Sequence, residues 1–384
     1  MAVVAGCGPR HAAPSRPLSA KRPYGRLRGR EANAGSAARP EAGPIDFVVT
    51  WVDGADPAWL ESRRRFRPAG ESPGAKGDGG ANAACRYRDF GTLRHWFRAV
   101  EACAPWVRKV FLVTAGQKPD WLDESAPKLR LVDHRDFIPA EWLPTFNARP
   151  IELNLHRIDD LAERFVFFND DMFLLRPVGP DFFFDRGLPR LPADLGYPRR
   201  VGFNNSNRTV FNDYALLHQC LDVPALLRRH ALQWIDPFRL GPARAARNLA
   251  CLLVNGTLPV KGWGHLSFPM LKSTLAEIWA ARPDVLAATS ARRFRTDDQV
   301  NQWVVHAWNL ATGRFSPVRG RGRGALVDLT TANLPAIEAA IAGRAVPQIC
   351  VNDTDGNDDP ERTGAVLVRA LDAAFPEPSS FEKA

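Results

Sequence analysis

Short apolar runs separated by helical repeats dominate the first half of the chain. Four runs are rich in β-branched and aromatic residues and stop at polar or turn-forming residues, as buried strands do. They cover Ile45–Val52, Val107–Thr114, Leu129–His134 and Phe165–Phe168. Helical spacing appears over Thr92–Cys103, where Leu93, Trp96, Phe97 and Val100 share one face, and over Ile151–Arg164. Strands that alternate with helices predict an α/β fold on a mostly parallel sheet covered on both faces.

Polar side chains follow the ends of these strands. Asp53, Thr114, His134 and the pair Asp170 and Asp171 stand at or just past four different strand ends. In a parallel sheet the carboxyl ends of the strands meet at one edge, and ligands bind beyond that edge. The sequence therefore predicts a binding site there.

The second half of the chain is irregular at first and then mainly helical. Helices are expected over Arg208–Leu221, Ala243–Val254, Met270–Ala281, Asp297–Ala311, Ile337–Gly343 and Glu361–Ala374. We interpret them as a helical cap or insertion beside the sheet. The expected division is a leader over 1–43 and one domain over 44–384. That domain consists of an α/β half (44–180), a variable insertion (181–260) and a helical half (261–384).

Charge changes the interpretation of the N-terminus. The chain has 384 residues and a formal net charge of +9, of which the first 44 residues carry +6. This segment is rich in Ala, Gly, Pro and Arg, so we expect a disordered basic leader, with a weak anchor for anionic lipid or polymer as the alternative. The remainder is nearly neutral and contains no recognised nucleic-acid motif, which argues against a nucleic-acid-binding protein.

Apolar content and cysteine usage bound the class of protein. Apolar residues make up 45% of the chain, enough for a globular core, and no apolar run approaches the ~18 residues of a membrane span. The six cysteines are dispersed and form no CxxC pair, which is typical of a reduced compartment. We expect a cytoplasmic protein without a transmembrane segment and leave open its association with the cytoplasmic face of a membrane.

The stretch RFVFFNDDMFLLRP places Asp170 and Asp171 directly after a predicted strand. Neighbouring side chains on a strand point to opposite faces, so both carboxylates can meet one ion only if the strand has ended. A hard divalent cation such as Mg²⁺ or Mn²⁺ is the functional reason for such a pair. A plain strand-end turn is the alternative, because Asn and Asp favour turns.

Other candidate residues have weaker local signals. Glu152 opens a predicted helix, where an acid is either favoured by the helix dipole or acts as a general base. His265 and Arg295 precede predicted helices and are either structural or, beside a diphosphate, a proton carrier and a phosphate ligand. Asp353 lies in ICVNDTDGNDD, a short strand running into acidic residues, for which a solvated turn is the alternative to a cation site.

Several of these segments together resemble the Stealth family of sugar-1-phosphate transferases. The similarity is carried by TWVDGADPAW, RYRDFGTLRHWFRAVEACAPWVRKVFLVTAGQKPDWL and RPIELNLHRIDDLAERFVFFNDDMFLLRPV, which look like the family's first two regions. Lys261–Leu310 resembles the third region and ICVNDTDGND the fourth. The resemblance implies a core like that of the GT-A nucleotide-diphosphosugar transferases, with 44–180 binding a nucleotide-sugar and 261–384 completing the active site.

The resemblance also implies roles for individual residues. The family's catalytic set falls on Glu152, Asp171, His265 and Arg295. Asp171 would hold the cation, with Asp170 or Asp353, and Arg295 would stabilise the transferring phosphoryl group. Either Glu152 or His265 would take the acceptor proton, with His265 preferred. The donor would be contacted by Thr50, Trp51, Asp53, Arg86 and Arg94.

The implied reaction moves a sugar-1-phosphate from a nucleotide-sugar, such as UDP-GlcNAc, to a hydroxyl of a glycan acceptor in capsule or cell-surface polysaccharide synthesis. The nearest alternative is a metal-dependent glycosyltransferase that attacks the sugar carbon and releases the nucleoside diphosphate. A non-catalytic module that binds glycans or nucleotide-sugars is a further alternative. The sequence names neither the sugar nor the acceptor.

Overall fold

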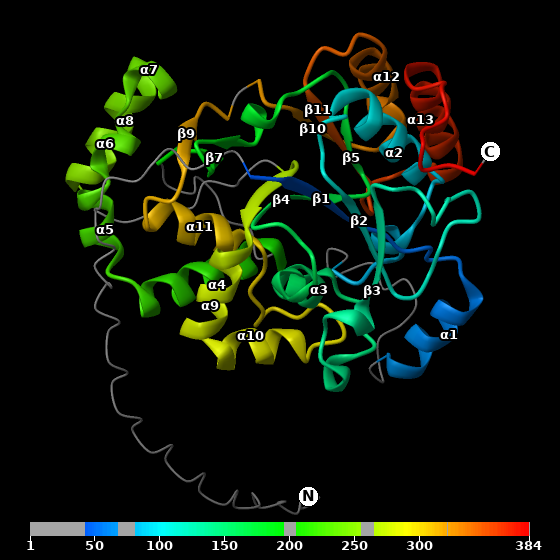
Figure 1. The fold of residues 1–384 in the computed structure, drawn as a ribbon, viewed down its shortest axis with the longest axis horizontal. Coiled ribbons are helices and arrows are strands. Elements are labelled where there is room, and N and C mark those ends of the chain that lie inside the picture. The colour runs from blue at the N-terminus through cyan, green and yellow to red at the C-terminus, as the bar shows by residue number, and fades with distance from the viewer. Residues whose placement is uncertain (1–42, 68–80, 196–204, 255–264, 321, 384) are drawn as a thin grey trace, which may run out of the picture. The chain divides into compact units, whose positions relative to one another are not determined.

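The computed structural model describes residues 43–67, 81–195, 205–254, 265–320 and 322–383 (Figure 1). The predicted leader over 1–43 lies almost wholly outside the described residues, and so do parts of the predicted variable insertion. The proposed division of the remaining chain into three parts stays a prediction.

A five-stranded sheet forms the centre of the described chain, in the order β3-β2-β1-β4-β8. The strands are β1 (Ile45–Thr50), β2 (Val110–Thr114), β3 (Leu129–Asp133), β4 (Arg164–Asn169) and β8 (Phe268–Leu271). The first four are parallel to one another, and β8 runs antiparallel to β4. Residues 45–49 of β1 are all buried, as expected of a central strand covered on both faces. The predicted mostly parallel α/β fold is confirmed.

Two smaller sheets flank the central one. The first has the order β10-β11-β5 and contains β10 (Ala325–Asp328), β11 (Gln348–Asn352) and β5 (Met172–Leu174). The second has the order β6-β7-β9 and contains β6 (Phe184–Asp185), β7 (Leu188–Pro192) and β9 (Ser316–Val318). Since β5 follows β4 after a two-residue turn, the chain passes directly from the central sheet into a flanking one at Asp170 and Asp171.

Helices surround the sheets. In the first half they are α1 (Pro57–Phe66), the 3₁₀ helix η1 (Ala84–Tyr87), α2 (Leu93–Cys103) and α3 (Ala148–Asn154). The second half contains α4 (Asn205–Cys220), α5 (Val223–Arg229), α6 (Ala231–Trp234), α7 (Pro237–Leu240), α8 (Pro242–Val254), α9 (Lys272–Ala281), α10 (Pro283–Ser290), α11 (Trp303–Ala311), α12 (Leu334–Ala342) and α13 (Pro360–Ala374). In Figure 1, α2, α12 and α13 lie above the central sheet, and α3, α9 and α10 lie below it.

Three predicted helices are shorter than expected. The helix predicted over Ile151–Arg164 ends as α3 at Asn154, because a 3₁₀ turn follows and Asp160 has a φ of +60° that no α-helix tolerates. The helix predicted from Met270 begins only at Lys272, because the apolar residues before it pair with β4 as β8. Residues 297–302, predicted as helix, form a loop with turns: the side chain of Gln299 accepts from Arg149 of α3, and the backbone N–H of Asn301 donates to Asp213 of α4.

Among the described residues, no helix combines the length and the apolar character needed to cross a bilayer. The cytoplasmic location and the association with a membrane face stay predictions.

Candidate active site

The turn between β4 and β5 holds the acidic pair at the junction of two sheets. Asp170 and Asp171 follow the last residue of β4, and the backbone N–H of Val351 in β11 donates to the carbonyl oxygen of Asp171 over 3.0 Å. This bond ties the turn to the flanking sheet. The carboxylates therefore stand at the carboxyl end of the parallel strands, where the sequence places them.

Negative charges collect around this turn. Burial raises the pKa of Asp170 well above its ordinary value, and the charges of Asp171 and Asp89 raise it further. The pKa of Asp171 is raised by burial, an effect that the charge of His265 opposes. The Oδ1 atom of Asp171 is buried and accepts no hydrogen bond from the described chain. Half-buried carboxylates that lie this close together fit a bound cation.

A possible metal site is formed by Asp171, His265 and Cys350, whose ligand atoms lie within 4.8 Å of one another. Burial and the neighbouring Asp171 raise the pKa of the Cys350 thiol well above its ordinary value, and this favours a protonated thiol that donates to Asp171. Cys350 then orients the carboxylate instead of binding a hard cation. The donor set of this turn fits a cation bound by carboxylate oxygens.

The predicted metal ligand Asp353 is not brought into this group. Its carboxylate accepts from Arg88 over 2.5 Å and from the amide of Asn357 over 2.9 Å. Two such partners satisfy the carboxylate without a cation. The placement of Asp353 as a ligand therefore finds no support in this geometry.

Positive charges also collect at the site. Arg295 is half-buried, and its pKa is lowered by desolvation of the guanidinium and by the like charge of Arg86, while Glu152 raises it. Arg149 lies beside it, with its pKa lowered to about 10 by burial and by the charge of Arg295. Glu152, 4% exposed, faces both Arg295 and Arg149. Crowded guanidinium groups with one nearby acid are suited to binding a polyanion such as a diphosphate.

The start of α3 explains how Glu152 and Arg295 meet although they are far apart in sequence. Asn147 caps α3 by accepting from the backbone N–H of Arg149 over 3.2 Å. The amide of Asn147 also donates to the carbonyl oxygens of Arg292 and Phe294 over 3.1 and 3.2 Å. One asparagine thus orders the first turn of α3 and holds the Arg295 segment against it.

His265 connects the acidic and basic sides. The side-chain amide of Asn169, the last residue of β4, lies at a hydrogen-bond distance of 3.1 Å from Nε2 of His265. Burial lowers the pKa of His265, Asp171 raises it, and Arg86 and Arg295 lower it, so all three lie close to the ring. The structure thereby gathers the predicted set Glu152, Asp171, His265 and Arg295, with Arg86 among them.

The predicted donor-binding residues divide into two groups. Thr50 ends β1 directly opposite Asn169 of β4. Burial raises the pKa of Asp89, the charge of Asp53 raises it further and Trp51 lowers it, so Trp51 and Asp53 both lie close to Asp89. Arg94 is different: its guanidinium lies 3.5 Å from Glu382 and 5.5 Å from the ring centre of Trp121. Arg94 therefore holds the C-terminal segment, and the structure does not bring it to the other donor-binding residues.

Sequence reasoning missed Asp89, Arg149, Asn169 and Cys350. Asp89 lies between η1 and α2 and Arg149 in the first turn of α3, and no local period marks either residue. Asn169 had a signal, since it precedes the acidic pair in Asn-Asp-Asp. Cys350 is one of six dispersed cysteines, and only the pairing of β11 with β5 places it beside Asp171.

Glu152 should make stability depend on pH. Its pKa in the folded chain is about 7, above the ordinary 4.5, because burial outweighs the attraction of Arg295 and Arg149. At a pH between these two pKa values, the folded chain keeps a proton on Glu152 that the unfolded chain releases. The free energy of unfolding therefore falls as the pH rises, and Glu152 contributes on the order of 3 kcal/mol to this fall. Glu152→Gln should remove this contribution.

The measurement is urea unfolding of both chains between about pH 5 and about pH 8, where the stability of Glu152→Gln relative to wild type should grow with pH. Burial raises the pKa of Asp213 well above its ordinary value, and the charge of Glu152 raises it further. Asp213 therefore also makes the free energy of unfolding fall as the pH rises. Glu141→Gln, at an exposed position, is the control and should follow the wild-type curve. Parallel curves for Glu152→Gln and wild type would contradict the assignment.

Comparison with known proteins adds to this geometry. Residues 43–71 match the family model described as Stealth protein CR1, conserved region 1, and residues 86–190 match Stealth protein CR2, conserved region 2. These segments contain Glu152, Asp170 and Asp171 and the predicted donor-binding residues. Both match the first two regions expected from the sequence.

Similar proteins cover most of the chain. A receptor polysaccharide phosphotransferase of Streptococcus oralis is 38% identical over 342 residues, which cover 88% of this chain and 99% of that protein. A capsular polysaccharide phosphotransferase of Streptococcus pneumoniae is similar to the same extent. An exopolysaccharide phosphotransferase of Lactiplantibacillus plantarum is 36% identical over 274 residues, 71% of this chain and 77% of that protein.

Similarity to solved structures is much weaker. A galactosyltransferase solved with donor and acceptor sugar analogues is 11% identical, with a TM-score of 0.37, over 87% of this chain and 96% of that chain. Similarity this low carries no functional argument.

Proposed function

The chain belongs to the Stealth family of polysaccharide phosphotransferases, and from this premise we propose that it transfers a sugar-1-phosphate from a nucleotide-sugar to a glycan hydroxyl, releasing the nucleoside monophosphate. One observation carries the proposal: Asp171, Arg86 and Arg295 all lie close to His265 at the end of the parallel strands. Such an arrangement suits a diphosphate that is gripped by arginines on one side and neutralised by a cation on the other.

The proposed reaction is an in-line substitution at the sugar-linked phosphorus. The acceptor oxygen forms a bond to this phosphorus, and the bond to the nucleoside phosphate breaks and leaves its electron pair on the departing oxygen. Arg295 stabilises the charge on the transferring phosphoryl group, with Arg149 and Arg86 beside it. The product is a phosphodiester that keeps the sugar-1-phosphate.

We assign the acceptor proton to His265. Burial lowers the pKa of His265 and so favours the neutral imidazole that a base requires, and Asn169, 3.1 Å from Nε2, holds the ring in place. His265 also adjoins Asp171, next to the carboxylates. Glu152 faces two arginines instead, which suits a residue that positions Arg295 and makes it the alternative base.

A divalent cation would complete the site. Asp171 would hold Mg²⁺ or Mn²⁺ together with Asp170, and the ion would neutralise the diphosphate and stabilise charge on the leaving phosphate. Asp353, engaged by Arg88 and Asn357, is not part of this proposal.

The test is incubation of the purified protein with a panel of nucleotide-sugars, including UDP-GlcNAc, in the presence of Mg²⁺ or Mn²⁺. At least one nucleotide-sugar should yield the nucleoside monophosphate. Release of the nucleoside diphosphate would favour a glycosyltransferase that attacks the sugar carbon. The absence of any release across the panel, with donor still bound, would favour a binding module.

A further inference from the structure

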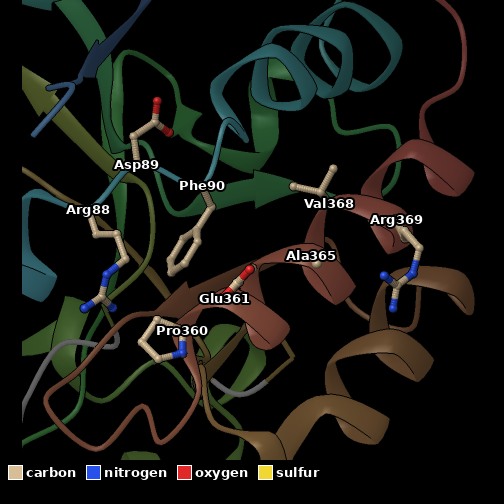
Figure 2. A pocket seen from close by; sticks show the side chains of 9 residues that line it. Arg88, Asp89, Phe90, Pro360, Glu361, Ala365, Val368 and Arg369 are labelled. Carbon is tan, nitrogen blue, oxygen red and sulfur yellow. The ribbon is translucent and has the colours of Figure 1, made fainter. Parts of the chain in front are cut away.

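A groove of about 540 Å³ opens between the segment Arg88–Phe90 and helix α13 (Figure 2). We call it the α13 groove, and its main lining residues are Arg88, Asp89, Phe90, Glu361, Ala365 and Arg369. Figure 2 shows the ring of Phe90 pointing toward α13 and the carboxylate of Asp89 pointing the other way from the same segment. One short stretch of backbone therefore presents an aromatic ring on one side and a carboxylate on the other.

Phe90 is held firmly in this groove. A Cβ atom added at Gly364 of α13 would lie 2.3 Å from Cδ1 of Phe90, so the ring packs directly on a glycine in the middle of the helix. The guanidinium of Arg88 lies 5.8 Å from the ring centre, and Arg88 is in turn fixed by Asp353 at 2.5 Å. An aromatic ring fixed in this way and still partly exposed is a ready contact surface.

The far wall of the groove is equally ordered. Asp359 caps α13 by accepting from the backbone N–H of Arg362 over 3.1 Å. The hydroxyl of Thr363 donates to the side chain of Asn357 over 3.1 Å, and Asn357 also holds Asp353. Both walls are therefore tied to the loop that follows β11.

The groove adjoins the turn of Asp170 and Asp171 through β11. Arg88, which lines the groove, binds Asp353 at 2.5 Å, and Asp353 directly follows β11. In β11 the backbone N–H of Val351 donates to the carbonyl oxygen of Asp171 over 3.0 Å. A molecule in the α13 groove would therefore lie next to the segment that holds the carboxylates, where an attacking acceptor has to be positioned.

The chemistry of the lining indicates the kind of occupant. Asp353 neutralises Arg88 and Glu361 balances Arg369, so the groove has no net charge that would favour a polyanion. Carboxylates accept hydrogen bonds from hydroxyls and guanidinium groups donate to them, while the ring of Phe90 offers an apolar face. Neutral saccharide units combine hydroxyls with apolar C–H faces and match this lining.

We propose that the α13 groove is the acceptor subsite and binds neutral saccharide units, with Phe90 as the contact for a sugar face. The proposal rests on the proposed function and deepens it, because it names the surface that carries the attacking hydroxyl. Phe90 acts in it as a binding and positioning residue.

The test blocks the groove from an exposed position of α13. Ala365→Trp fills the groove, and Ala373→Trp, also exposed on α13 but outside the lining, is the matched control. A second pair is Phe90→Ala against Phe238→Ala; Phe238 is 95% exposed and lines a separate groove of about 530 Å³. Because Ala365 and Ala373 are exposed, the two tryptophan variants keep the test valid even if Phe90→Ala fails to fold.

The assay uses whichever nucleotide-sugar yields nucleoside monophosphate, with neutral oligosaccharides prepared by mild acid hydrolysis and dephosphorylation of a phosphodiester-linked capsular polysaccharide. Ala365→Trp and Phe90→Ala should raise the acceptor KM relative to the donor KM at least about tenfold, while both controls keep the wild-type ratio. An unchanged ratio in Ala365→Trp overturns the proposal. A rise confined to the donor KM also overturns it and makes the groove a nucleotide site. If wild type yields no nucleoside monophosphate, the proposed function fails instead.

Discussion

Asp171→Asn is expected to lower turnover on the order of 10³-fold without lowering the stability of the metal-free chain. Asp171 lies beside Asp170 and its charge raises the pKa of Asp170, while desolvation raises the pKa of both carboxyl groups. A neutral amide removes this repulsion but cannot replace a charged ligand for a divalent cation. Loss of activity and gain of stability should therefore occur together.

Thermal unfolding in chelator, followed by addition of Mn²⁺ or Mg²⁺, separates these effects. Wild type should gain melting temperature with the ion, because a ligand that binds only the folded state stabilises it, and Asp171→Asn should not. Asp159→Asn, at an exposed position before β4, is the control and should behave as wild type. Normal turnover by Asp171→Asn, or a metal-dependent rise of its melting temperature equal to that of wild type, would contradict the role of Asp171.

Arg295→Ala should lower turnover by a similar factor, about 10³-fold, because an arginine on a transferring phosphoryl group contributes on this scale. The guanidinium of Arg295 is fixed by the carbonyl oxygen of Ala81, to which it donates over 3.0 Å. The side chain of Asn82 also accepts from the backbone N–H of Arg295 over 2.9 Å. Arg295→Lys keeps a positive charge but loses the planar fork, so it should restore only a small part of the activity.

Single-turnover assays at saturating donor are the measurement for this prediction, since they report chemistry apart from binding. Arg292→Ala, in the same loop, is the control: Arg292 forms an exposed pair with Asp298 at 2.7 Å, which contributes little. Its rate should equal that of wild type. A wild-type rate for Arg295→Ala would remove Arg295 from the site.

The strands and the acidic edge could be predicted from the sequence because their signals are local. The buried strands β1, β2 and β4 consist mostly of apolar residues, and the residues that end them are polar. The parallel order of these strands then brings Asp53 and Asp171 to one edge without further information.

The remaining features depend on tertiary contacts that leave no local pattern. The run Phe268–Leu271 suits a strand as well as the start of a helix, and only its pairing with β4 decides for the strand. Gln299 lies in a loop because its side chain accepts from Arg149 over 2.7 Å and from the backbone N–H of Thr296 over 3.0 Å. The convergence of Arg86, Arg149 and Arg295 likewise depends on how α3 packs.

The central claim is that the sugar-linked phosphorus, not the sugar carbon, is attacked. The most direct measurement uses a nucleotide-sugar that carries ³²P at the sugar-linked phosphorus, incubated with the enzyme and a glycan acceptor. The account predicts that the label moves into the glycan product while unlabelled nucleoside monophosphate is released. Label that stays with the nucleotide, as labelled nucleoside diphosphate, while unlabelled sugar joins the glycan would contradict it.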